Sequence, residues 1–161
     1  MRRRVVQMFV GSAVLALAAV GWAQYDSQGM DSEGTGEDAL PVGVIRDRHE
    51  LMESIGANAK KVGKAVKAGD NATVASAAQK IQEAAGQITN LYPEGSLHAK
   101  SRAKAEIWKN WSGFTADAQK LQDTSAKLVT AAKNNGDVNA ASKAMFDTCK
   151  ACHDDFRKPE D

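Results

Sequence analysis

The sequence predicts an all-α protein folded as an antiparallel four-helix bundle in up-down-up-down order. Apolar residues recur at spacings of three and four over four segments after Pro41, which is the signature of amphipathic helices. Short stretches rich in Gly, Asn, Asp and Pro separate these segments, and no strand-like alternation of useful length occurs. Helices joined by such connections pack most simply as antiparallel neighbours.

The first helix is expected over residues 45–66, where the apolar positions form one stripe. Arg48 stands in this stripe between Ile45 and Met52. A charge at a core position needs a partner, because removal from water is costly. Gly69 can close the helix in the left-handed conformation.

The remaining three helices follow from the same pattern. Asp70 can cap the second, whose stripe runs over 74–91 before Pro93 and Gly95 prevent continuation. The third is expected over 107–132, ending at Asn134-Asn135-Gly136-Asp137. Asp137 can cap the fourth, whose stripe covers 138–156 and ends before Pro159.

The N-terminus has the layout of a cleavable secretory signal. Three consecutive arginines precede a mainly apolar run over 8–20 and the sequence Gly21-Trp22-Ala23. We expect cleavage after Ala23, which predicts a periplasmic protein. The apolar run is shorter than the roughly 20 residues of a membrane span, although an uncleaved anchor is the alternative. Residues 24–39, rich in Gly, Ser and acids, are predicted to form a flexible leader to a domain over 40–161.

Charge argues against nucleic acid as a partner. Removal of residues 1–23 takes three arginines from the 21 basic residues and leaves 18 against 20 acidic ones, a formal charge of −2. The predicted mature chain therefore has no basic field that could attract a polyanion, and we expect no membrane span after cleavage.

The stretch CKACHDDFRK contains both cysteines of the chain, Cys149 and Cys152, and places His153 directly after the second. The three residues stand at i, i+3 and i+4, so they are predicted to share one face of a helix turn and to point into the bundle. This pattern favours covalent attachment of a c-type haem, in which two thiols bind the porphyrin and the histidine ligates iron.

Two other kinds of site fit the motif less well. A thioredoxin-like dithiol sits at the start of a helix after a strand, whereas this pair lies near the end of a helix. A structural zinc site needs a fourth ligand, for which only His49 and His98 remain as further histidines. We expect both to be solvated.

From Val42 to Lys158 the chain resembles the cytochrome c prime family, the four-helix class of c-type cytochromes. The residues that carry the resemblance are CKACHDDFRK, RHELM on the first helix and EIWKNWSGF at the start of the third. In that family an aromatic and a basic residue follow the haem motif, matched here by Phe156 and Arg157. An arginine on the first helix often lies near the haem propionates and the distal pocket, which implies that role for Arg48.

The resemblance implies one of two functions. In one branch of the family the position one turn after the arginine is apolar, the iron is five-coordinate, and nitric oxide or carbon monoxide can bind. In the other a methionine there ligates iron, and the protein is a low-spin electron carrier. Because Met52 occupies this position, we expect axial ligation by His153 and Met52, with gas binding as the alternative.

The expected partners follow from this function. Redox proteins could contact the lysines at 60, 61, 64 and 67, although such a run is usually a solvated helix face. Relatives of this kind often form a homodimer through the first two helices. An enzymatic role in peroxide reduction would require His49 to serve as a distal acid-base group, and we therefore expect no enzyme.

Overall fold

The computed structural model describes residues 43–159. The predicted signal over 1–23 and leader over 24–39 lie outside these residues. Residues 43–159 belong to a single compact unit.

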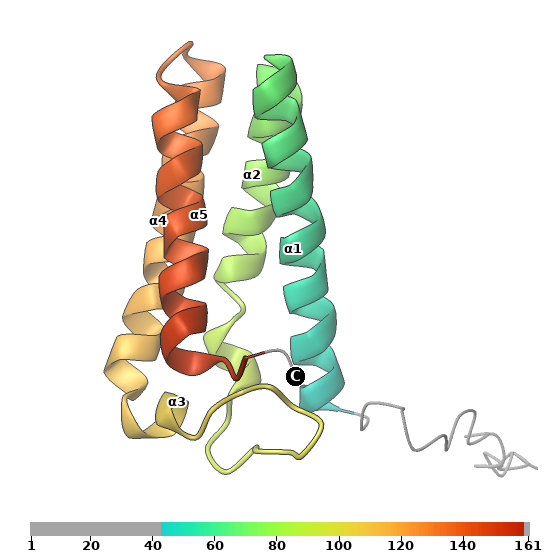
Figure 1. The fold of residues 1–161 in the computed structure, drawn as a ribbon, viewed down its shortest axis with the longest axis vertical. Helices are drawn as coiled ribbons and strands as arrows, with labels where there is room; N and C mark the ends of the chain where they lie inside the picture. Colours follow the sequence, from blue (N-terminus) through green and yellow to red (C-terminus); the bar gives the residue numbers. More distant parts are fainter. Residues whose placement is uncertain (1–42, 160–161) are drawn as a thin grey trace, which may run out of the picture. The chain divides into compact units, whose positions relative to one another are not determined.

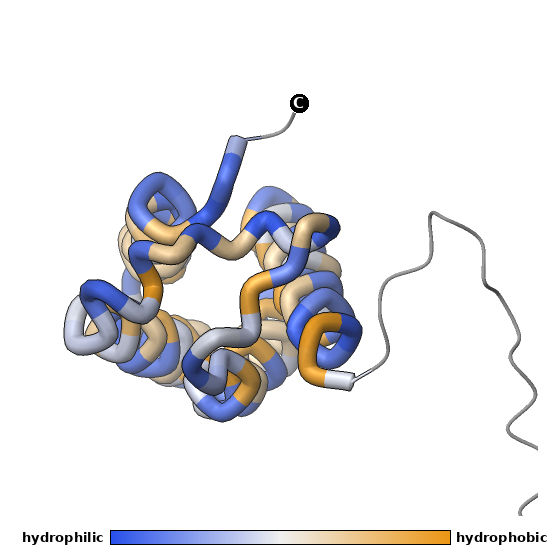
Figure 2. The backbone as a smooth tube through the Cα atoms, turned by 90° about the horizontal axis from the view of Figure 1, so that it is seen from below, coloured by the Kyte–Doolittle hydropathy of each residue, from blue (hydrophilic) through white to orange (hydrophobic). Residues whose placement is uncertain are grey.

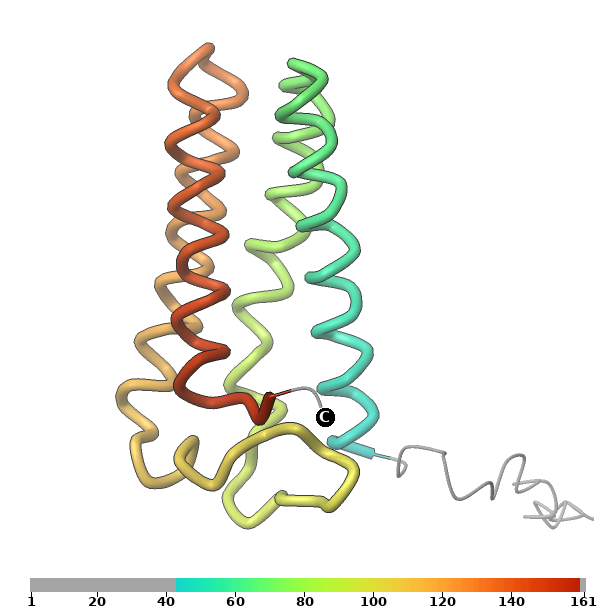
Figure 3. The backbone as a smooth tube through the Cα atoms, viewed as in Figure 1, coloured from blue at the N-terminus to red at the C-terminus, as the bar shows by residue number. Residues whose placement is uncertain are grey.

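Four long helices form the described part of the chain, and the predicted fold class is confirmed. They are α1 (Val44–Ala68), α2 (Asn71–Ala85), α4 (Trp111–Lys133) and α5 (Val138–Phe156). Figure 1 and Figure 3 show α1 and α4 running in one direction and α2 and α5 in the other. The view along the bundle in Figure 2 shows the long helices arranged around a common axis.

Helix packing is uneven around the bundle. α1 packs along α2, α2 along α4 and α4 along α5, whereas α1 and α5 meet over a much shorter stretch. One point of approach joins Gly63 and Phe146: a Cβ atom built on Gly63 would lie 3.9 Å from Cζ of the Phe146 ring. The start of α1 and the end of α5 lie at the same end of the bundle (Figure 1). The two helices nevertheless have few contacts with each other.

Two predicted helices differ from the structure at the haem-motif end of the bundle. The second ends at Ala85, and the short η1 (Thr89–Leu91) follows it. The third is divided into α3 (Glu106–Lys109) and α4, because Asn110 leaves the helical conformation at φ −123° and ψ 55°. Its side chain accepts a hydrogen bond of 3.2 Å from Gly113 N, so Asn110 caps α4. The apolar stripe in the sequence continues past this point, so it gives no sign that a helix cap interrupts the third helix.

The core contains the predicted apolar positions and a few polar ones. Val62, Ile81, Leu128 and Met145 are fully buried. Arg48 is only 4% exposed, as its place in the first stripe predicted. Among the described residues, no helix is long and apolar enough to cross a bilayer.

Candidate functional site

The haem motif lies on the last two turns of α5. Asp137 begins this helix, and its carboxylate accepts a hydrogen bond of 2.9 Å from Ala140 N. Fully buried Met145 anchors the inner face of α5 in the core, as expected. Cys149 and Cys152 follow on the same face, where both are half-buried and pack against the core.

His153 lies at the margin of this face. Its side chain is exposed, whereas those of the two cysteines are half-buried. His153 is rotated by only about 40° around the helix from Cys149, so the two share a face of α5, and its turn toward a haem inside the bundle stays a prediction. Partial desolvation, followed by the positive charges of Arg157 and Arg102, lowers the pKa of His153. The imidazole is therefore neutral at physiological pH and has a lone pair available for a metal.

The environment of the thiols opposes redox chemistry. Burial, followed by the charges of Asp117, Cys149 and Asp155, raises the pKa of Cys152 to about 12. Burial also raises the pKa of Cys149. Reactive dithiols need the opposite shift, because the thiolate is the nucleophile. Both cysteines are free thiols in the structure.

A zinc site finds no support in residues 43–159, where no group of three or more His, Cys, Asp or Glu side chains could hold a metal ion. His49 is exposed on α1 and lies 3.2 Å from the Glu53 carboxylate, measured from Nε2. His98 is exposed in the connection between η1 and α3. Neither histidine joins the cysteine motif, and His49 is not placed as a distal acid-base group.

Arg48 fixes the connection that follows η1. Its Nε donates to the carbonyl oxygen of Leu91, Nη1 donates to the carbonyl oxygen of Ser96 at 2.9 Å, and Nη2 donates to Ser96 Oγ. Its Cζ lies 4.2 Å from the centroid of the Tyr92 ring and 5.8 Å from that of Trp108. No carboxylate within residues 43–159 forms an ion pair with Arg48. Burial lowers its pKa from 12.5, and the guanidinium stays charged.

Tyr92 connects the arginine to the haem motif. Burial raises the pKa of its phenol, the charge of Arg48 opposes this shift, and neighbouring Cys152 adds to it. Arg48 of α1 thus lies over the Tyr92 ring, and Cys152 of α5 is near enough to affect the pKa of the same phenol. Sequence reasoning missed Tyr92 and Ser96, because they lie in a connection without periodic pattern.

Aromatic rings complete this end of the bundle. The Tyr92 ring lies 4.8 Å from Phe114, measured between centroids, and Phe114 lies 5.4 Å from Phe156. Trp108 Nε1 donates to the carbonyl oxygens of Tyr92 and Pro93 at 3.1 and 3.0 Å. Tyr92, Phe114 and Phe156 belong to the hydrophobic core against which both cysteines pack.

Met52 is half-buried on α1, one turn after Arg48, and packs against the core. The structure places it on the same helix face as Arg48, as predicted. Ligation of a haem iron by its thioether stays a prediction.

These residues fit a covalently bound haem. The two thiols are protonated, half-buried and packed against the hydrophobic core, which suits the apolar edge of a porphyrin. The neutral, accessible imidazole of His153 suits ligation of iron.

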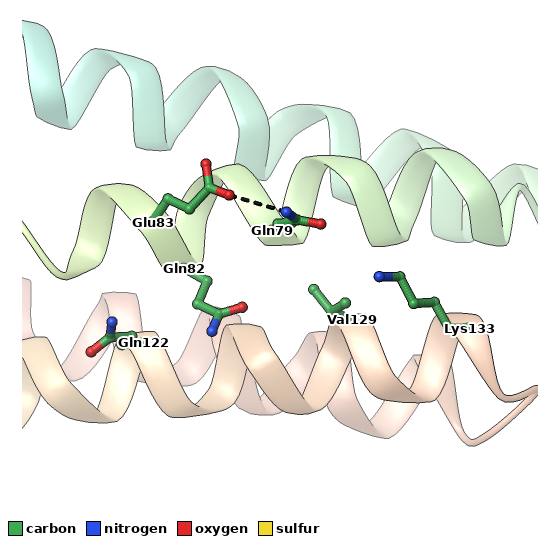
Figure 4. Close-up of a pocket in the computed structure, with 6 residues that line it drawn as sticks. All are labelled: Gln79, Gln82, Glu83, Gln122, Val129 and Lys133. Atoms are coloured by element: carbon green, nitrogen blue, oxygen red, sulfur yellow. Dashed lines mark hydrogen bonds between the residues drawn. The ribbon is translucent and has the colours of Figure 1, made fainter.

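A hollow on the surface lies elsewhere, between α2 and α4. Figure 4 shows its polar lining, which includes Gln82, Glu83, Gln122 and Lys133, with Gln79 Nε2 donating to Glu83 Oε1 at 3.1 Å. None of the motif residues contributes to it, and flexible polar side chains surround it. It is a groove between two helices and not the haem site.

Residues 43–157 match the family described as Cytochrome C'. A cytochrome c' of Rhodospirillum rubrum is 32% identical over 126 residues, which cover 74% of this chain and 84% of the relative. A cytochrome c-556 of Agrobacterium fabrum is 30% identical over 119 residues, or 71% of this chain and 81% of the relative. Among solved structures, a nitric oxide complex of a cytochrome c prime variant from Alcaligenes xylosoxidans matches with a TM-score of 0.65 at 23% identity, covering 72% of this chain and 94% of that one.

Proposed function

Because this chain belongs to the cytochrome c prime family, which binds one c-type haem, we propose that it binds nitric oxide or carbon monoxide at a five-coordinate haem iron. Cys149 and Cys152 would hold the haem covalently, and His153 would be the protein's axial ligand. This reverses the order of the two functions expected from the sequence, where electron transfer with Met52 as a second ligand came first.

The observation that carries the proposal is the match to cytochrome c' over nearly all of the described residues. The cytochrome c' of Alcaligenes, for which nitric oxide complexes have been solved, is also 41% identical to this chain over 59 residues. The packing of Met52 with the core supports a side chain that fills space beside the iron without ligating it.

Each residue then has a distinct task. When bound, the haem supplies an iron atom with one coordination position free for a diatomic gas. Arg48 holds the segment from Leu91 to Ser96 against α1, and this keeps Tyr92 beside Cys152. Met52 limits the size of a molecule that can approach from the α1 side and excludes water from it.

We further propose that residues 1–23 direct export to the periplasm and are removed, because haem of this type is attached outside the cytoplasm. The arginine-led apolar segment and the family of the domain support the same compartment.

Electron transfer is the second candidate, and the identity of residue 52 favours it. A thioether is a good ligand for ferrous haem iron, and ligation by histidine and methionine raises the reduction potential. A gas would then have to displace Met52 before it could bind.

Titration of the reduced holoprotein with carbon monoxide tests the proposal, with absorption spectra recorded at each step. We expect the wild type and Met52→Leu to bind with affinities within a few-fold of each other, because neither side chain ligates iron. Met145→Leu, at a fully buried methionine of α5, controls for loss of packing. A gain of a hundredfold or more in Met52→Leu alone would support the electron carrier instead.

A further inference from the structure

The C-terminal end of α5 lacks a cap of its own. The helix ends at Phe156, and Arg157 is extended at φ −117° and ψ 134°, with no glycine to reverse the chain. Arg157 N donates to the carbonyl oxygen of His153 at 3.1 Å. The next carbonyl groups, those of Asp154, Asp155 and Phe156, have no partner within the helix.

Lys104, about fifty residues earlier in the chain, supplies the missing donors. Its Nζ donates to the carbonyl oxygens of Asp154 at 2.8 Å and Asp155 at 3.0 Å. Its backbone N donates to the carbonyl oxygen of Phe156 at 3.0 Å. One residue thus satisfies the last three carbonyl groups of α5, and its positive charge is favoured at the negative end of the helix dipole.

Backbone pairing holds Lys104 in this position. Ala103 and Arg157 form an antiparallel bridge, and Lys158 N donates to the carbonyl oxygen of Arg102 at 2.8 Å. The Arg102 side chain in turn donates to the carbonyl oxygen of Lys158 from Nε at 3.2 Å and Nη2 at 2.9 Å. The backbone therefore pairs over a short stretch that comprises residues 102–104 and 156–158. We call this pairing the C-terminal clamp.

The C-terminal clamp binds the last turn of α5, which carries His153. His153 is three residues from the end of α5, and helix ends open more readily than helix centres. We propose that Lys104 is a positioning residue for His153, which keeps the last turn of α5 closed so that the imidazole holds one orientation toward the iron. This inference rests on the proposed function, in which His153 is the axial ligand.

The test compares Lys104→Met with Lys104→Arg in the holoprotein. Methionine keeps the length of the side chain and removes its charge and donors, whereas arginine keeps both. Lys109→Met is the matched control, because Lys109 is exposed and its ammonium group lies 3.5 Å from the carboxylate of Glu106, whereas that of Lys104 binds the last carbonyl groups of α5. The readouts are the iron–histidine stretching band of the reduced protein in resonance Raman spectra, the reduction potential, and hydrogen exchange of the Arg157 amide.

We expect Lys104→Met to exchange the Arg157 amide at least about tenfold faster, because the substitution removes two charge-assisted hydrogen bonds and the loss of one alone corresponds to about that factor. Its iron–histidine band should broaden and move to lower frequency, and its potential should shift. Lys104→Arg should restore all three readouts, and Lys109→Met should leave them as in the wild type.

Two outcomes would overturn the inference in distinguishable ways. If Lys104→Met loses thermal stability but keeps the wild-type band and potential, the clamp is purely structural and the proposed function stands. If the wild type itself lacks an iron–histidine band, the reduced iron is not five-coordinate with a histidine ligand, and the proposed function fails. If Lys104→Met then also exchanges the Arg157 amide at the wild-type rate and keeps the wild-type potential, the inference about Lys104 fails as well.

Discussion

The guanidinium carbon of Arg48 lies 4.2 Å from the centre of the Tyr92 ring. The buried positive charge of α1 therefore contacts the face of an aromatic ring 44 positions later in the chain. The same guanidinium binds the carbonyl oxygens of Leu91 and Ser96. These contacts give Arg48 partners within the protein. Its pairing with a haem propionate, implied by the family resemblance, stays a prediction.

Replacement of Arg48 by Leu should destabilise the protein by about 2–4 kcal/mol, because two carbonyl groups and one hydroxyl lose a charged donor at once. Chemical denaturation of the holoprotein measures this free energy. Arg46→Leu is the control, since Arg46 is exposed and only pairs with Glu50 at 3.8 Å, and it should change stability by no more than about 0.5 kcal/mol. An equal loss of unfolding free energy in the two variants would show that the buried contacts of Arg48 add no stability beyond that of an exposed arginine.

Two glycines of α1 should respond to alanine in opposite directions. Gly63 lies inside the helix, and an added Cβ would meet the Phe146 ring at an ordinary 3.9 Å, so Gly63→Ala should stabilise the protein by about 0.5–1 kcal/mol. Gly69 ends the helix at φ 67°, so Gly69→Ala should destabilise it by about 1 kcal/mol. Melting temperatures measure both. A loss of stability in Gly63→Ala would mean that α1 and α5 approach more closely at Phe146 than the structure shows.

The thiols of the chain without haem should be unreactive near neutral pH. With the pKa of Cys152 raised from 9.0 to about 12, iodoacetamide should alkylate the folded chain at pH 8 at least about tenfold more slowly than the urea-unfolded chain. The folded state holds this proton more tightly than the unfolded state. The resulting stability is therefore complete below pH 9 and is lost as the pH rises toward 12. Fast alkylation of the folded chain would show that the thiols are not desolvated.

The sequence was sufficient for the parts of the site that lie on helices. The apolar stripes predicted the bundle, the buried place of Arg48 and the shared face of Cys149 and Cys152. Tyr92, Ser96 and Lys104 escaped prediction because their contacts join residues 44 to 51 positions apart in the chain, and such contacts leave no local pattern. The exposure of His153 also depends on tertiary packing, since periodicity places it only at the edge of a stripe.

Covalent attachment should be visible in the intact mass. The exported protein should carry one haem on a chain that starts near Gln24, and acid–organic extraction should leave the colour with the polypeptide. Cys149→Ala and Cys152→Ala should each remove one of the two bonds, and the double variant should release haem on extraction. A doubly substituted protein that retains its colour would place the attachment at other residues.

The magnetic circular dichroism spectrum of the oxidised wild-type holoprotein, recorded from the visible into the near infrared, tests the central claim most directly. If the iron has His153 as its only strong protein ligand, the spectrum should be that of a high-spin haem and should contain no near-infrared band from sulfur to iron. Met52→Leu should then leave it unchanged. A low-spin spectrum with such a band, abolished by Met52→Leu, would contradict the gas-binding account and assign electron transfer to this protein.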